Sequence, residues 1–305
     1  MPAPKELVPR VLAEGLYFGE SPRYRDGKLY ISDMTGRKIY AIDEHTGKKE
    51  VFLNMENQPN GMCFLDDGSL ICSSMFDAKL YHVKDGKSTL YADMSHVMTG
   101  YCGDMVIDKA GRVFLDDSGA RVLHGEKPGP GRLLRIDPDR SVNIAEEKIF
   151  FPNALCISPD GKSLYNAESF GYGLLKFDLA EDGTLSNRQE VWTPATLAGE
   201  RGASAESMIG IDGGCMDAEG GIWLSLLALE QFVRLDPDSG EITHRIKVSG
   251  HAVCCTLGGD DGKTLFLGVN WTPPDENLFK AMVALKTRGT VLSVRVDIAH
   301  GAARP

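Results

Sequence analysis

A weak internal repeat runs along the chain and limits the folds that the chain can adopt. Each copy has a leading polar residue, a few mostly apolar residues, a turn that contains glycine, and a second apolar run. Self-similarity at a spacing of roughly 40 to 60 residues is typical of propellers and other repeat folds. Six copies align, and their leading residues are Glu20, Asn60, Asp104, Asn153, Asp212 and His251.

Each copy continues into a second half that alternates apolar and polar residues around another turn. Examples are RLLRIDPDRSVNIAEE (132–147) and QFVRLDPDSGEITHRIKV (231–248). A period of two with Asp/Gly or Pro-Asp turns predicts β-hairpins, so each copy supplies four strands. No long stretch shows the 3.6-residue apolar period of a helix. We therefore predict an all-β fold, a six-bladed β-propeller with four-stranded blades.

The two ends of the chain are expected to close the ring together. TVLSVRVDIA (290–299) supplies a late strand, and LVPRVLAEG (7–15) is expected to be the outermost strand of the last blade. No linker is evident, so residues 1–305 are expected to form a single propeller domain. The small-residue stretch TPATLAGERGASAESMIG (193–210) is typical of a long loop.

Charge and composition exclude several classes of partner. The formal net charge is −10, which argues against nucleic acid and against an anionic membrane surface. No signal-peptide pattern and no membrane-spanning apolar run is present in the sequence. The seven cysteines form no CxxC pair, and most lie in apolar runs, as reduced thiols do. We expect a cytoplasmic monomer or homodimer that acts on a small molecule.

The leading residues are expected to lie at one height around the axis, because the first strand of each blade lines the central channel. Carboxylates gathered there would repel and desolvate one another without a cation. Carboxylate and amide oxygens suit Ca²⁺, Mg²⁺ or Mn²⁺ more than Zn²⁺. We expect one divalent metal ion, Ca²⁺ first, with the other three as alternatives. Asn60 and Asp212 precede glycines, so simple turns remain open as their roles.

Six segments, in order, resemble the SMP-30/gluconolactonase/luciferin-regenerating-enzyme-like family over nearly the whole chain. They are GESPRY (19–24), PNGMCF (59–64), CGDMVIDKAGRVFLDD (102–117), FPNALCISPDGKSLYNAES (151–169), IDGGCMDAEGGIW (211–223) and CCTLGGDDGKTLFL (254–267). The resemblance implies a six-bladed propeller with one catalytic divalent metal that is open to solvent on one face. It places metal ligands at Glu20, Asn153 and Asp212.

The third repeat departs from the sugar-lactonase pattern. Those members usually carry Asn-Asp there, with an arginine two residues before the Asn that holds sugar hydroxyls, whereas this chain has Tyr101-Cys102-Gly103-Asp104. The departure argues against gluconolactone. An Asp at this place resembles the drug-responsive lactonase branch, in which it joins the metal shell, so Asp104 is expected as a fourth ligand. Gly213 replaces a polar neighbour of that branch, and the match is partial.

The resemblance implies hydrolysis of a lactone or ester, with a carboxylate beside the metal as general base. We expect Asp212 in this role, Asp104 as its competitor, and Glu20 as a ligand only. His251 is expected either to move a proton or to be a structural histidine. Substrate contacts are expected from Asn60, Tyr101, Cys102, His124, Phe151 and Met208. Their largely apolar surroundings favour an apolar or aromatic substrate.

Two other interpretations of the same scaffold remain open. One is a different metal-dependent reaction, by a phosphotriesterase or by a lyase or isomerase that stabilises an enolate. The other is a calcium-binding propeller without catalysis. Propellers host unrelated chemistries, so the fold alone does not decide between them.

Overall fold

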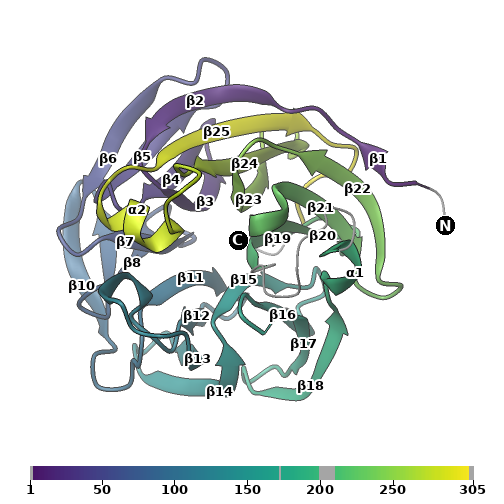
Figure 1. Cartoon of the computed structure of the whole chain (residues 1–305). Helices are drawn as coiled ribbons and strands as arrows, with labels where there is room; N and C mark the ends of the chain where they lie inside the picture. Colours follow the sequence, from purple (N-terminus) through teal and green to yellow (C-terminus); the bar gives the residue numbers. More distant parts are fainter. Residues whose placement is uncertain (1–2, 172, 199–209, 302–305) are drawn as a thin grey trace.

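Six sheets stand in a ring around one axis in the computed structural model, which describes residues 3–171, 173–198 and 210–301 (Figure 1). Blade 1 has β3 (Gly19–Arg25), β4 (Lys28–Asp33), β5 (Lys38–Asp43) and β6 (Lys49–Asn54). Blade 2 has β7 (Pro59–Phe64), β8 (Leu70–Ser74), β9 (Lys79–Lys84) and β10 (Lys87–Asp93). Blade 3 has β11 (Cys102–Ile107), β12 (Val113–Asp117), β13 (Pro130–Ile136) and β14 (Val142–Phe150).

The other three blades repeat this antiparallel order. Blade 4 has β15 (Pro152–Ile157), β16 (Ser163–Glu168), β17 (Gly173–Leu179) and β18 (Leu185–Trp192). Blade 5 has β19 (Ile211–Met216), β20 (Ile222–Leu226), β21 (Gln231–Asp236) and β22 (Glu241–Lys247), to which the short β1 (Lys5–Glu6) adds in parallel. Blade 6 has β23 (His251–Gly258), β24 (Thr264–Trp271) and β25 (Arg288–Arg295). The short helices are η1 (Val122–His124), α1 (Ala195–Ala198), η3 (Leu227–Leu229) and α2 (Leu278–Val283).

The two ends of the chain close the ring, as the sequence predicts. The N-terminal strand β2 (Arg10–Leu16) pairs antiparallel with β25 and is the outermost strand of blade 6. β25 covers 288–295, slightly before the predicted segment. Closure removes the open sheet edge that an unclosed ring would present. The predicted six-bladed, four-stranded propeller is confirmed.

One backbone conformation explains why glycine recurs in the turn of every repeat. Each copy's turn glycine lies in the left-handed region, with φ between 71° and 82°; the six are Gly27, Gly68, Gly111, Gly161, Gly220 and Gly262. Glycine adopts this conformation without the steric cost that a Cβ brings. The repeat in the sequence is therefore a repeated turn between the first two strands of each blade.

Carboxylates at the outer end of the second strand hold the segment that enters a blade. Asp33 accepts hydrogen bonds from the Tyr17 and Phe18 amides, both at 2.9 Å. Asp117 accepts from the Thr99 amide at 2.8 Å and the Gly100 amide at 2.7 Å. The same arrangement recurs at Glu168, which accepts from the Phe150 amide. In these three blades the bonds fix where the innermost strand begins, and so they help to set which residues face the axis.

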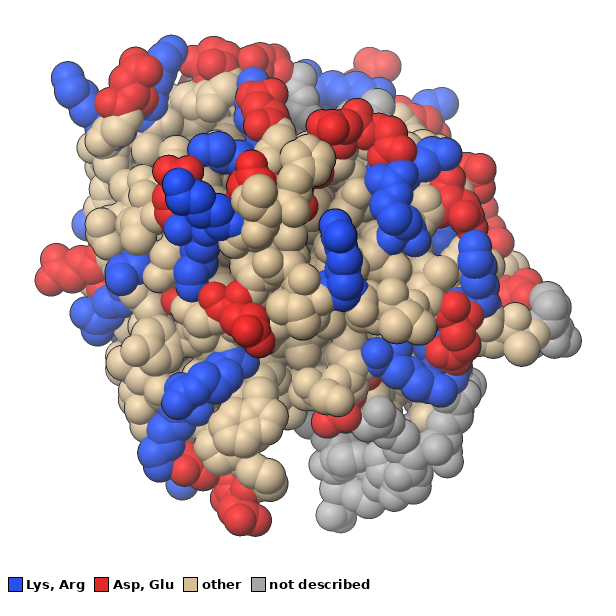
Figure 2. Space-filling view, turned by 90° about the horizontal axis from the view of Figure 1, so that it is seen from above, with Lys and Arg blue, Asp and Glu red and all other residues tan. Residues whose placement is uncertain are grey.

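The core lies between neighbouring blades, where innermost strands pack on one another. All seven cysteines are buried and free, as expected for small apolar side chains. Seen from above Figure 1, Lys and Arg are interspersed with Asp and Glu, so this side of the ring carries no broad field of one sign (Figure 2). Among the described residues, no helix is both long enough and apolar enough to cross a bilayer.

Replacing Asp117 by alanine should strongly destabilise the fold. Asp117 is fully buried, and its loss leaves three backbone amides and the Thr99 hydroxyl without this acceptor. We expect the free energy of unfolding to fall by about 3–5 kcal/mol, measured by denaturant titration. Asp139→Ala, in an exposed turn, is the matched control and should change it by less than about 0.5 kcal/mol. Equal effects of the two substitutions would contradict the anchoring role.

Candidate metal centre and its cavity

A cavity of about 110 Å³ opens on the axis of the ring. Five of the six predicted leading residues line it, namely Glu20, Asn60, Asp104, Asn153 and Asp212. They come from the innermost strands β3, β7, β11, β15 and β19 of five different blades. The structure therefore brings all four predicted metal ligands to one cavity, although they are far apart in the sequence.

A bulge in every innermost strand sets which residue faces the axis. In blades 1 to 5 the pairing with the second strand shifts just after the leading position. Cys102 pairs with Asp117 as Pro59 pairs with Ser74, so Gly103, and not Asp104, corresponds to Asn60. The repeat alignment was wrong by one residue in blade 3. Asp104 still reaches the cavity, but from one position further along its strand.

Asp104 is held by a buried arginine that the sequence analysis missed. Arg23 Nη2 lies 2.7 Å from Asp104 Oδ1 and 2.5 Å from the Met105 carbonyl oxygen. The Met105 amide also donates to Oδ1, at 2.8 Å. Arg23 is 3% exposed and links blade 1 to blade 3. The available signal was an arginine three residues after the predicted ligand Glu20, within the innermost strand GESPRYR (19–25).

A second missed residue is Asp116, which lines the cavity from the second strand of blade 3. Its Oδ2 accepts a hydrogen bond from the Asp104 amide at 2.9 Å. Asp116 is 2% exposed. The double Asp in FLDD (114–117) was the signal, because blade 2 has Ser-Ser at the same place.

Asn153 and Asp212 form a direct pair on the other side of the cavity. Asn153 Nδ2 donates to Asp212 Oδ1 at 2.6 Å, while Asn153 Oδ1 accepts from the Ala154 amide at 3.1 Å. Asn60 Oδ1 accepts from the Ser21 hydroxyl at 2.8 Å. These bonds orient the amide oxygens and leave the second Asp212 oxygen for a ligand.

Burial and mutual repulsion shift the acidity of these carboxyl groups. Burial raises the pKa of Asp212 to about 8, against the hydrogen bond from Asn153, and Asp104 raises it further. Burial raises the pKa of Glu20 well above its ordinary value, and Asp212, Asp104 and Asp116 add to the shift. The pKa of Asp116 is raised by burial and by Asp104. Four carboxyl groups line the cavity, the Arg23 guanidinium pairs with one of them from outside it, and this donor set fits a hard cation.

The predicted ligand atoms lie further apart than the oxygens around a bound ion. Among the described His, Cys, Asp and Glu side chains, the one group with three ligand atoms within 4.8 Å of one another is Glu44, His45 and Asp260. Glu20, Asp104 and Asp212 are spread more widely. Calcium needs oxygens at about 2.3–2.6 Å, so side-chain rotation must accompany its binding.

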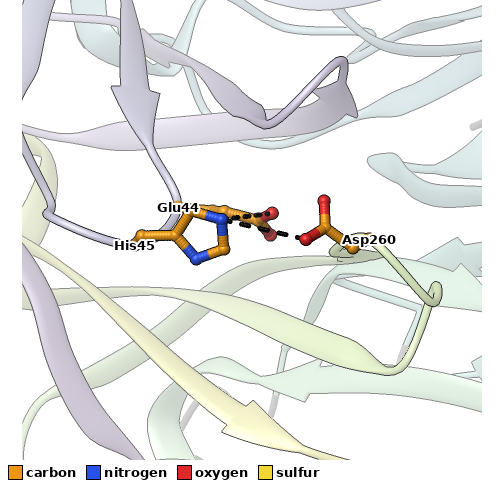
Figure 3. Close-up of side chains that lie close together, drawn as sticks. All are labelled: Glu44, His45 and Asp260. Atoms are coloured by element: carbon orange, nitrogen blue, oxygen red, sulfur yellow. Dashed lines mark ion pairs between the residues drawn. The ribbon is translucent and has the colours of Figure 1, made fainter.

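In the Glu44 group, Glu44 and His45 follow β5 of blade 1 and face Asp260, which lies between β23 and β24 of blade 6 (Figure 3). His45 Nε2 is 3.5 Å from Glu44 Oε1 and 3.8 Å from Asp260 Oδ2. The Tyr24 hydroxyl also donates to Glu44 Oε1, at 2.9 Å. His45 and Asp260 are mostly exposed, and the group is an ion-pair cluster that joins the first blade to the last.

Apolar side chains form the wall above the carboxylates. Tyr101 and Phe151, both predicted substrate contacts, line the cavity. So do three residues of α2, namely Leu278, Phe279 and Met282. No lysine or arginine is among the described lining residues. The wall therefore favours uncharged, apolar ligand groups over phosphate or carboxylate.

Three predicted site residues do not line this cavity. Cys102 is fully buried between blades, and its Sγ donates to the Ser74 carbonyl oxygen at 3.2 Å. His124 lies behind Tyr101, with its Nδ1 2.5 Å from the Tyr101 hydroxyl. His251 is half-buried at the start of β23, where burial lowers its pKa. Met208 lies outside the described residues.

The acidity shifts give an expected pH dependence of stability. The pKa values of Asp212 and Glu20 are higher in the folded state than in the unfolded state, so the folded state favours their protonated forms. The chelator-treated protein should therefore lose stability as pH rises toward about 8. A cation binds the ionised forms, so stabilisation by Ca²⁺ should grow with pH and reach about 2.7 kcal/mol at a hundred times its Kd. Thermal unfolding with chelator or Ca²⁺ between about pH 5 and about pH 8 measures both effects. A Ca²⁺ effect that does not change with pH would contradict this account.

Comparison with known proteins agrees with the fold. Regucalcin of Oryctolagus cuniculus is 24% identical over 266 residues, which are 84% of each chain. Among solved structures, a calcium-binding protein, regucalcin, from Agrobacterium tumefaciens has a TM-score of 0.81 and 20% identity over 100% of this chain and 99% of that one. A gluconolactonase from Xanthomonas campestris has a TM-score of 0.70 and 18% identity, covering 94% of this chain and 89% of that one.

The family model of the SMP-30/gluconolactonase/LRE-like region matches residues 18–269. This span runs from the entry of blade 1 into β24 of blade 6 and includes every predicted metal ligand. The chain belongs to the SMP-30/gluconolactonase/LRE-like family.

Proposed function

We propose that this protein is a divalent-metal-dependent hydrolase that opens a lactone or ester of a small apolar or aromatic molecule. The observation that carries the proposal is the combination of four carboxylates at the base of the axial cavity with an apolar wall above them. The base suits a cation that polarises a carbonyl, and the wall suits the organic part of the substrate.

The proposed metal holders are Glu20, Asn153 and Asp212, with Asp104 as a fourth. Asp104 Oδ1 already accepts two hydrogen bonds, from Arg23 and from the Met105 amide, so its Oδ2 is the oxygen left for an ion. The names of the relatives, regucalcin and a calcium-binding protein, support Ca²⁺ as the first choice. When bound, the ion supplies Lewis-acid polarisation of the carbonyl.

Asp212 is the proposed general base. Its Oδ1 is fixed by the Asn153 amide, which leaves Oδ2 to accept a proton from the attacking water. The competing carboxylate, Asp104, already pairs with Arg23 through its Oδ1, so it has one oxygen fewer to offer to a water molecule. A nearby cation favours the ionised form of Asp212 at neutral pH.

The wall narrows the substrate class within the family. One structural neighbour is named a gluconolactonase, and gluconolactone is a sugar lactone rich in hydroxyl groups. In this chain Tyr101, Phe151 and Phe279 line the cavity, and no described arginine does. The proposal therefore names an apolar or aromatic lactone before a sugar.

Charge and thiol chemistry support the rest of the proposal. A net charge of −10 supports a small-molecule partner over nucleic acid or an anionic membrane. Seven free, buried cysteines support a reducing, cytoplasmic location. The chain is proposed to act as a monomer or homodimer.

Asp212→Asn should separate base catalysis from metal binding. Asparagine keeps an oxygen for the ion but accepts no proton, so kcat should fall by about 100-fold or more while the Kd for Ca²⁺ rises less than about tenfold. Steady-state lactone hydrolysis and calorimetric Ca²⁺ titration measure the two. Asp236→Asn, at the end of β21 and outside the cavity, is the matched control and should leave both unchanged. Wild-type kcat in Asp212→Asn would refute the assigned base.

A substrate panel tests the proposed chemical class. Dihydrocoumarin should be hydrolysed with a kcat/KM at least about tenfold above that for gluconolactone, because the wall offers apolar contact and no cationic side chain among its described residues. Activity should vanish with chelator and return with Ca²⁺, Mg²⁺, Mn²⁺ or Zn²⁺. If none of the four ions supports turnover of any lactone or ester, the hydrolase proposal fails.

A further inference from the structure

A second pocket, of about 400 Å³, lies beside the axial cavity under α2. We call it the α2 pocket; its walls come from the β4–β5 turn, the segment before β7, η1 and α2. The side chains of Leu123 and Met282 line both spaces and form the partition between them. Figure 1 shows α2 beside the centre of the ring, near β7 and β8. The α2 pocket is thus next to the proposed reaction site, on the same face of the propeller.

Two buried polar atoms in the α2 pocket lack a hydrogen-bond partner. Thr35 is 5% exposed and Gln58 is 9% exposed, and both line the pocket. The Thr35 hydroxyl and Gln58 Oε1 each lack a hydrogen-bond partner among the described residues. Buried polar groups of native proteins are nearly always paired, with protein, water or ligand. One hydroxyl and one carbonyl oxygen of the residues that line this pocket are therefore unpaired.

The charges around the α2 pocket favour an anion. Arg37 lines it, and its guanidinium makes no ion pair with any described carboxylate. None of the described lining residues is acidic, in a chain whose net charge is −10. His124 also lines the pocket; because its Nδ1 contacts the Tyr101 hydroxyl, its Nε2 is the nitrogen left for a ligand. A guanidinium and an unpaired hydroxyl from residues that line one pocket suit a carboxylate.

We infer that the α2 pocket binds a small hydroxycarboxylate. Its carboxylate pairs with Arg37 and accepts from the Thr35 hydroxyl, and its own hydroxyl donates to Gln58 Oε1. This inference rests on the proposed function, because water added across the C–O ring bond of a lactone yields a carboxylate, a hydroxyl group and a proton. The pocket would thus receive the ring-opened product across the partition of Leu123 and Met282, and methionine is an adaptable side chain at such a place.

The test is a titration of the full chain, kept in chelator, with 4-hydroxybutyrate. Saturation-transfer NMR measures the binding. Butyrate, which lacks the hydroxyl, and 1,4-butanediol, which lacks the carboxylate, are the matched ligands. We expect 4-hydroxybutyrate to bind most tightly of the three. Arg37→Met should weaken it by about tenfold or more, since a charge-assisted hydrogen bond is lost. Thr35→Val, which keeps the shape of the side chain, should weaken it by a smaller factor.

Arg121→Met is the control, since Arg121 precedes η1 but does not line the α2 pocket. It should leave binding unchanged. Equal loss in Arg37→Met and Arg121→Met would mean unspecific charge attraction and would overturn the inference. Binding that requires added Ca²⁺ and is unchanged in Arg37→Met would place the carboxylate at the metal and would overturn the inference. The complete absence of binding would overturn it as well, because water alone would then satisfy Thr35 and Gln58.

Lactone hydrolysis by the same preparations keeps the two proposals distinguishable. Turnover without Arg37-dependent binding would refute the α2 pocket and leave the hydrolase standing. Arg37-dependent binding without turnover of any lactone would refute the hydrolase and leave a hydroxycarboxylate site whose ligand has another origin.

Discussion

Mutual repulsion among four carboxylates buried around one axis is the constraint on which the rest of this structure depends. Glu20, Asp104, Asp116 and Asp212 line a single small cavity, and one buried guanidinium, that of Arg23, offsets part of their charge. Burial raises the pKa of Glu20, Asp116 and Asp212 and so favours their protonated forms. The divalent cation that we propose would offset this repulsion when it is bound to the ionised carboxylates.

The propeller makes this arrangement possible because its blades each bring an innermost strand to the axis. Ring closure by β2 and β25 prevents the blades from separating, and carboxylates such as Asp33 and Asp117 fix where the innermost strands begin. The bulge after each leading residue then turns the side chain toward the axis. Burying the carboxylates of the cavity costs folding free energy. The surrounding sheets keep these carboxylates buried in spite of that cost.

Much of the fold and part of the site could be predicted from the sequence. Turn glycines such as Gly27 and Gly68 recur for a conformational reason, so the blade number could be inferred from them. Glu20 and Asp212 were placed at the axis because their position in the repeat matches the position in the strand. The same logic failed for Asp104, since a one-residue shift in blade 3 is invisible in a repeat as weak as this one.

The other features that could not be predicted from the sequence are contacts between distant strands and helices. Arg23 pairs with a residue two blades away, and no local pattern reveals such a partner. Cys102 was expected to face the site, but its side chain points into the core between blades. The helix α2 lies in the segment between β24 and β25 and is too short for a periodic signal, but it supplies a wall of both pockets. Tertiary packing, which a single sequence does not display, decided each of these cases.

The central claim, one divalent ion on the axis, is tested most directly by anomalous diffraction from crystals soaked in Mn²⁺. The account requires a single dominant peak within coordination distance of Glu20, Asn153 and Asp212, and its disappearance in Glu20→Gln crystals soaked in the same way. An empty axis, or a dominant peak at Glu44, His45 and Asp260, would contradict it.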